Sequence, residues 1–262
     1  MTADERLALI WHKIERANKH IRDLGAAIAS FNASNPYRVE KNSQAGLPYY
    51  ISAIQPVPME IPIILGDTIQ NLRTALDYLA QQLYLAGSGA TEYRKETSFF
   101  IASKASEYKR LLGGKVQGMR QEAIDALCAL EPYKGGKGHA FWTLHSLNNI
   151  DKHRTLVAVG SGFRSVDLVP MMMVNATPEE RAALKKYSFF IRPANYVCPL
   201  KVGDELPVGF GVPVELNPYM KFRFDVALYE PEIIKPGPML EIVQHLADLV
   251  SNTVRAFKPL LA

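Results

Sequence analysis

The side chains best able to do chemistry lie in one run of seven residues, in which only Ile150 is apolar. The run follows an apolar pattern with helical spacing and precedes the apolar stretch 156–159, so it lies between two segments that favour burial. This placement predicts either a buried hydrogen-bond network or a functional site. The run consists of Asn148, Asn149, Ile150, Asp151, Lys152, His153 and Arg154.

Histidine spacing tests whether this run could hold a metal ion. His145, Asn149 and His153 recur every four residues, which places them on one side of a helix. The two histidines are then about 12 Å apart along the helix axis, too far to bind one metal together. A metal would need a carboxylate from elsewhere, such as Asp67, and the sequence has no HxxxH or HExxH motif. We therefore expect neither a metal nor a cofactor.

The end of a helix offers another interpretation of the same charges. Cations stabilise a helix C-terminus, where carbonyl groups lack partners, and Lys152, His153 and Arg154 fall at such an end. Asp151 could then pair with Arg154 or with a lysine on a neighbouring element. In this interpretation the run caps a helix and carries no activity.

A second polar pattern covers residues 66–79. At about 100° per residue, its polar side chains form two adjacent strips along one helix. The first strip is Asp67, Asn71, Thr74 and Tyr78, and the second is Gln70, Arg73, Asp77 and Gln81. Arg73 and Asp77 have the i,i+4 spacing of a helical ion pair. The pattern predicts a solvated helix face, or a polar strip that faces another helix or a second subunit.

The two segments resemble the signature segments of a group of bacterial proteins without an assigned biochemical function. Residues 66–79 follow the pattern GDxxxNLRxALDxL, and residues 144–154 follow LxxLxNIDKHR. The resemblance covers roughly residues 1–160.

The first segment also resembles, more weakly, the Arg–His ribonuclease signature of the HEPN superfamily of helical-bundle proteins. Members often act in toxin–antitoxin and phage-defence systems and cut RNA without metal at a dimer interface. Arg73 has the place of the signature Arg, but Tyr78 has the place of the His. The resemblance implies that Arg73 holds a phosphate, Asp77 orients it, and Tyr78 or His153 handles protons. Because tyrosine titrates near pH 10, this departure undermines cleavage and leaves RNA or nucleotide binding.

Helices must position most of these side chains. Apolar residues between Leu7 and Phe31 recur at alternating spacings of three and four, which predicts one long helix over 4–31. Residues 37–40 and 49–52 predict a short hairpin. Further apolar stripes predict helices over 65–86, 117–130, 140–152 and 238–257.

The second half of the chain changes to short runs with Pro and Gly between them, which is typical of antiparallel strands. These runs are 155–159, 166–174, 187–192, 205–209 and 221–228. The predicted class is α+β, a bundle of about four helices with an appended antiparallel sheet and a C-terminal helix. Residues 1–154 would form the bundle and hairpin, and residues 155–262 would pack on it as part of the same domain.

Composition narrows the class of protein. Of the 262 residues, 48% are hydrophobic and 21% charged, as in globular proteins. The net charge of +4, with signs interspersed, permits an acidic partner such as RNA without arguing for one. The sequence start has no apolar secretory core, and no run of about eighteen apolar residues predicts a membrane span. Cys128 and Cys198 show no CxxC spacing, so we expect a cytoplasmic protein with reduced thiols.

These patterns predict a non-enzymatic interaction module, which could be a homodimer, with both polar segments in one hydrogen-bond network. A HEPN-like protein that binds RNA or a nucleotide, with weak or absent ribonuclease activity, is the alternative. A metal-dependent enzyme that acts on a small molecule through Asp67, His145 and His153 is the second alternative. Contact between Arg73 and His153 would favour a shared site.

Overall fold

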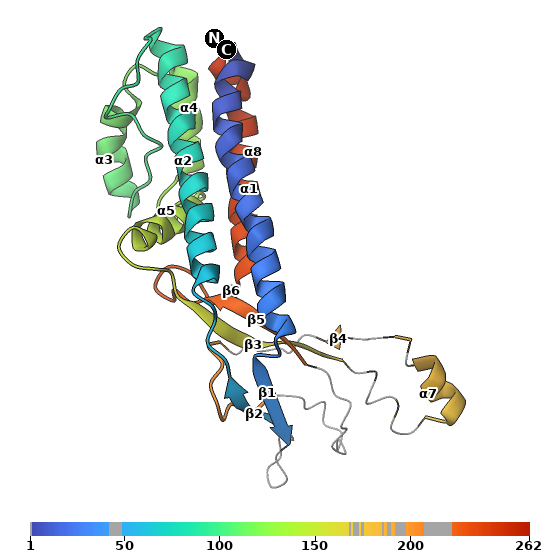
Figure 1. Cartoon of the computed structure of the whole chain (residues 1–262). Helices are drawn as coiled ribbons and strands as arrows, with labels where there is room; N and C mark the ends of the chain where they lie inside the picture. Colours follow the sequence, from blue (N-terminus) through green and yellow to red (C-terminus); the bar gives the residue numbers. More distant parts are fainter. Residues whose placement is uncertain are drawn as a thin grey trace.

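Three long helices run side by side, and a small sheet lies at one end of them (Figure 1). They are α1 (Ala3–Ala33), α2 (Glu60–Ser88) and α8 (Met239–Phe257). Both chain termini lie at the end of the bundle away from the sheet. The computed structural model describes residues 2–41, 49–167, 169, 173, 176–184, 186–187, 190–191, 198–206 and 222–262. The predicted α+β class is confirmed.

The long N-terminal helix is confirmed. The apolar residues of its predicted seam are all buried, which fixes the face that α1 turns to the bundle. Thr2 and Glu5 form a capping box at its start, so two free backbone N–H groups gain acceptors. The buried seam residues are Leu7, Ile10, Ile14, Ala17, Ile21, Leu24, Ile28 and Phe31.

The other predicted helices agree with the structure except around residue 117. α2 begins at Glu60, before the predicted start at residue 65, and accommodates Pro62 in its first turn. α5 (His139–Asp151) and α8 lie close to their predicted bounds.

The helix predicted over 117–130 corresponds to α4 (Gln121–Leu130), which begins four residues later than predicted. A further helix, α3 (Ala105–Val116), precedes it and was not predicted. Between them Gly118 has a φ of 90°, which lies outside helical conformation. The sequence pattern hid α3 because Gly113 and Gly114, both poor helix formers, lie inside it.

The strands form two antiparallel sheets. The hairpin pairs β1 (Tyr37–Lys41) with β2 (Tyr49–Ile54). The larger sheet has the order β4-β3-β5-β6. Its strands are β4 (Phe190–Ile191), β3 (Ala158–Asp167), β5 (Phe222–Leu228) and β6 (Gly237–Pro238).

Some strand predictions fall partly outside the described residues. The strand predicted over 155–159 begins only at Ala158, and β3 carries on without a break to Asp167. Most of 168–175, part of 187–192 and all of 207–209 lie outside the description. In the described part of 205–209, Glu205 forms an isolated bridge with Tyr50.

One apolar core joins residues from both sides of position 154. Val226 and Leu228 of β5 belong to the same buried cluster as the seams of α1, α2 and α8. A smaller cluster beneath the hairpin contains Tyr49, Ile51, Leu200 and Leu206. Short helices at α7 (Pro178–Leu184) and η1 (Lys258–Leu261) complete the described elements. In the described part of the chain, no helix is both long and apolar enough to cross a membrane.

Candidate functional site

The two polar segments meet, because α2 and α5 pack against each other. Their closest approach is at Gly66, where any Cβ atom would overlap the carboxylate of Asp151. Only glycine leaves room for this group, so the α5 carboxylate rests directly against the α2 backbone. We call the region formed by residues 66–77 of α2 and 145–152 of α5 the α2–α5 junction.

Two carboxylates stand near each other at one end of the junction. Burial raises the pKa of Asp151, and the charge of Asp67 raises it as well. Such a pair could attract a cation, but no group of three or more His, Cys, Asp or Glu residues in the described structure could hold a metal. The metal-dependent alternative therefore has no support from this geometry.

Arg73 and Asp77 form the ion pair expected from their spacing, with 2.8 Å between Nη1 and Oδ1. Both side chains also hold the backbone of Phe99. Arg73 Nη2 donates to the Phe99 carbonyl at 2.9 Å, and the Phe99 N–H donates to Asp77 Oδ1 at 3.1 Å. The Arg73 side chain is only 11% exposed. Burial raises the pKa of Asp77, while the Arg73 charge opposes that shift.

The same strip continues one turn along α2. Gln81 Nε2 donates to the carbonyls of Arg94 and Thr97, and its Oε1 accepts the Arg94 N–H. Arg73, Asp77 and Gln81 together bind the segment 94–99 along the helix. The strip therefore binds a loop of its own chain, whereas the sequence pattern predicts a solvated face or a strip that faces another helix or a second subunit.

His145 is the histidine that lies at the level of Arg73. The Asn149 amide nitrogen and His145 Nε2 lie 3.0 Å apart, within hydrogen-bond distance. Nδ1 is buried and has no hydrogen-bond partner among the described groups. Burial first, and then the charges of Arg73 and Lys152, lower the pKa of His145 to about 4. The imidazole is thus neutral at pH 7 and a weak base.

His153 lies toward the other end of the junction. It follows Asp151, which packs at Gly66, and Gly66 is seven residues from Arg73, or about 10 Å along α2. The His153 side chain is exposed. Among the described residues, His153 forms no hydrogen bond or ion pair with Arg73, whereas the charge of Arg73 acts on His145.

The remaining predicted residues have local partners. Tyr78 is 39% exposed, and its ring lies under Lys13 of α1, 5.9 Å from Nζ to the ring centroid. Arg154 pairs with the buried Glu230 through two bonds of 2.9 and 2.7 Å, and not with Asp151.

Two asparagines complete the set of predicted residues. The amide of Asn71 donates to the Asp67 carbonyl within α2. Asn148 is 2% exposed, and its Oδ1 has no hydrogen-bond partner in the part of the chain that the structure describes. Of the residues expected to form a buried network at the junction, Asn148 is buried, whereas Asn149 and Lys152 are exposed.

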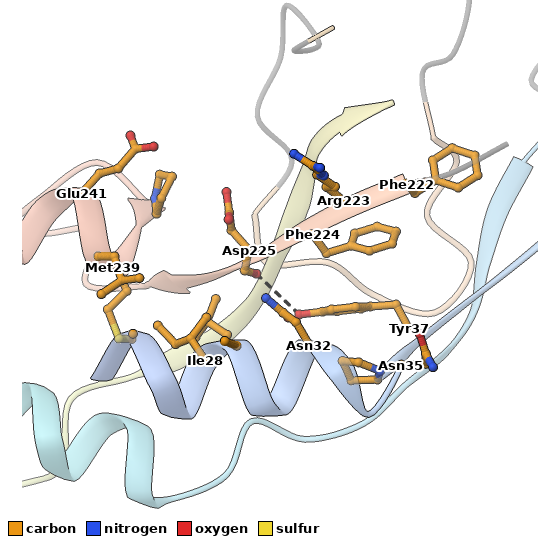
Figure 2. A pocket seen from close by; sticks show the side chains of 16 residues that line it. Ile28, Asn32, Asn35, Tyr37, Phe222, Arg223, Phe224, Asp225, Met239 and Glu241 are labelled. Carbon is orange, nitrogen blue, oxygen red and sulfur yellow. Dashed lines mark hydrogen bonds between the residues drawn. The ribbon is translucent and has the colours of Figure 1, made fainter. Parts of the chain in front are cut away.

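A ligand-sized hollow lies elsewhere, where the end of α1 meets β5 and the start of α8 (Figure 2). Its volume of about 590 Å³ is within the range of small-molecule pockets. Gly25 and Ala29 leave space on the α1 side, and the Tyr37 hydroxyl donates to the Asp225 carbonyl at 3.4 Å. None of the residues predicted from sequence lines this hollow. In the sequence, only the small residues Gly25 and Ala29 near the end of α1 could have indicated this hollow.

The charged residues of this hollow do not define a ligand. Arg223, Asp225 and Glu241 each take part in interactions of their own. A second hollow of about 630 Å³ lies between α5 and α8, where Ile233, Ile242 and His245 are among its lining residues. Its lining combines aliphatic groups with scattered polar ones and does not specify a ligand either.

Comparison with known proteins finds no match among family models, curated proteins or solved structures. The function is therefore argued from the geometry of this chain alone.

Proposed function

We propose that this protein is a non-enzymatic interaction module, in which the α2–α5 junction serves the fold. The observation that carries this proposal is the arrangement of Arg73 and Asp77. Both side chains form hydrogen bonds with the backbone of Phe99 and an ion pair with each other. The Arg73 guanidinium is nearly covered and is engaged by Asp77 and Phe99, which favours a structural role, whereas a catalytic group must be open to a substrate.

The acid–base properties of the junction support the same proposal. A ribonuclease without metal needs a group that exchanges protons near neutral pH. The pKa of His145 is lowered to about 4, and its Nδ1 is covered by protein. A phosphate would reach the Arg73 guanidinium only after the bonds to Asp77 and Phe99 had opened.

The interaction could be with a second copy or with another molecule. Analytical ultracentrifugation at several concentrations distinguishes a monomer from the homodimer considered above.

A matched pair of substitutions tests the structural role of the junction. Asp77→Ala removes the partner of Arg73 and the acceptor of the Phe99 N–H, so we expect it to lower the free energy of unfolding by about 1–3 kcal/mol. Asp23→Ala is the control, because Asp23 pairs with Lys19 at the same i,i+4 spacing on α1, but the Lys19 side chain is 55% exposed, against 11% for Arg73. It should have little effect, as is usual for surface pairs. Urea denaturation measures both.

An activity measurement accompanies these variants. Purified protein is incubated with labelled tRNA and single-stranded RNA, and the products are separated on a denaturing gel. We expect intact RNA. Cleavage that disappears in the His145→Gln variant would overturn the proposal, as would an Asp77→Ala variant as stable as the Asp23→Ala control.

A further inference from the structure

The outer face of α3 carries exposed residues that no other element of the described structure covers. α3 stands at the edge of the bundle, beside α2 and α4 (Figure 1). The exposed residues of α3 are three or four positions apart, which places them on one side of the helix. The set consists of Ser106, Lys109, Arg110, Gly113, Gly114 and Gln117, and we call it the α3 face.

The α3 face and its surroundings are strongly basic. Lys104, Lys109, Arg110 and Lys115 are the cations of residues 104–117, and Glu107 is the one acid. The Glu107 carboxylate already accepts the Ser103 N–H at 3.0 Å. Within the described part of the chain, none of the four cations forms an ion pair. The face therefore presents uncompensated positive charge to an acidic partner.

Two adjacent glycines without side-chain neighbours lie in the middle of this charge, and the Gly114 carbonyl accepts a hydrogen bond from Arg94 Nη1 at 3.2 Å. Each costs about 1 kcal/mol relative to alanine inside a helix. Gly113 and Gly114 have helical conformation, and a Cβ on either would meet nothing within 4 Å. Neither packing nor backbone geometry in the described chain requires them. A surface without side chains allows another molecule to approach the helix closely.

The apolar side of α3 is used inside the protein. Tyr108 donates its hydroxyl to the Leu127 carbonyl at 3.0 Å and stacks on Phe100, and Leu112 and Val116 are buried. The outward face has no apolar or aromatic side chain. Membrane-surface helices and the centres of protein interfaces both rely on such anchors, so this face fits neither well.

We propose that the α3 face binds the sugar-phosphate backbone of a nucleic acid without reading its sequence. A double helix offers one negative charge per about 1.7 Å of its axis, so several phosphates lie within reach of the 12-residue, roughly 18 Å length of α3. Lysine and arginine contact phosphates, and Ser106 and Gln117 add neutral donors. This inference rests on the proposed interaction role and names the class of partner. It does not involve the α2–α5 junction.

Fluorescence anisotropy of the full chain with labelled oligonucleotides of about 20 nucleotides tests the proposal. The probes are single-stranded RNA, duplex RNA and duplex DNA. Comparing their affinities shows which type of nucleic acid the protein prefers. We expect binding that weakens as salt increases. The Lys109→Glu, Arg110→Glu double variant should bind at least about tenfold more weakly, with a salt slope reduced by roughly 1.4–1.8 for two lost phosphate contacts.

A second double variant controls for net charge. Arg16→Glu with Arg22→Glu makes the same change of charge at exposed positions of α1. It should weaken binding much less than the α3 variant. Gly113→Ala with Gly114→Ala should raise the melting temperature and still weaken binding, because the methyl groups keep the phosphates away.

Several outcomes would overturn the proposal. They are absence of binding at low salt, equal effects of the α1 and α3 charge reversals, and wild-type affinity in the glycine variant. Binding to anionic phosphatidylserine vesicles or to polyglutamate, but not to nucleic acid, would overturn it in favour of another polyanion. The proposed function fails separately, since RNA cleavage would contradict that proposal and leave binding by α3 in place.

Discussion

The role of a charged residue in this protein depends on what surrounds it and not on its type or spacing. Arg73–Asp77 and Lys19–Asp23 are both i,i+4 ion pairs with 2.8 Å separations. The first is mostly covered and continues into the backbone of Phe99, whereas the second is in solvent. Screening by water makes the second pair weak, so only the first organises the fold.

His145 should couple stability to pH at the same scale. Its folded pKa of about 4 lies below the ordinary 6.5, so the folded state favours the neutral ring. The contribution of the neutral His145 ring to the stability of the folded state is fully present above pH 6.5 and is lost as the pH falls toward 4. His145→Gln should remove this loss and flatten the acid side of the stability profile.

Urea denaturation of both proteins between about pH 4 and pH 7 measures the effect. Asp77 and Asp151 have raised pKa values and act in the opposite direction, because their protonated forms are favoured in the folded state. The difference between wild type and variant isolates His145. Parallel profiles would contradict its lowered pKa, which an NMR titration of the imidazole measures directly.

At the scale of elements, the approach of the Asp151 carboxylate of α5 to α2 depends on one glycine. Gly66→Ala would favour the helix locally but force the Asp151 carboxylate away from α2. We expect a net loss of about 1–3 kcal/mol in the free energy of unfolding, as for other overpacked sites. Adding Asp151→Ala should restore much of that loss, because it removes the overlapping group.

Gly25→Ala on α1 is the matched control. A Cβ there would meet only Leu240, at an ordinary contact distance of 3.9 Å. This variant should be neutral or slightly stabilising, since alanine favours helices. Equal effects at both glycines, measured by urea denaturation, would refute the close approach of α5 at Gly66.

At the scale of the whole molecule, the bundle and the sheet share one core and an ion pair whose carboxylate is buried. Glu230 joins Arg154, just past the end of α5, to the Val157 N–H at the start of the sheet. We expect one cooperative unfolding transition. Glu230→Gln should lower its midpoint without splitting it, because a charge-assisted bond is replaced by a weaker one.

Two probes measured together test this cooperativity. Circular dichroism follows the helices, and fluorescence follows Trp11 on α1 and Trp142 on α5. Coincident curves in wild type and variant are expected for a single domain. Separate transitions would contradict a single cooperative unit.

The sequence alone determined the features that depend on neighbours along the chain. The apolar seam of α1, the bounds of α5 and the Arg73–Asp77 pair follow from helical spacing, because residues three or four apart share one face. α3 was missed for a local reason as well, since Gly113 and Gly114 weaken the helical pattern.

Only the tertiary structure decided which groups these residues meet. Phe99 is 26 residues from Arg73, and Glu230 is 76 residues from Arg154. The place of His145 near Arg73 and the fit of Asp151 at Gly66 depend on how α2 and α5 pack, and the hollow beside Tyr37 depends on how α1, β5 and α8 meet. Such contacts arise from the burial of apolar faces on distant segments, which sets the separation and rotation of the helices. The spacing of residues within one segment does not predict how distant segments pack.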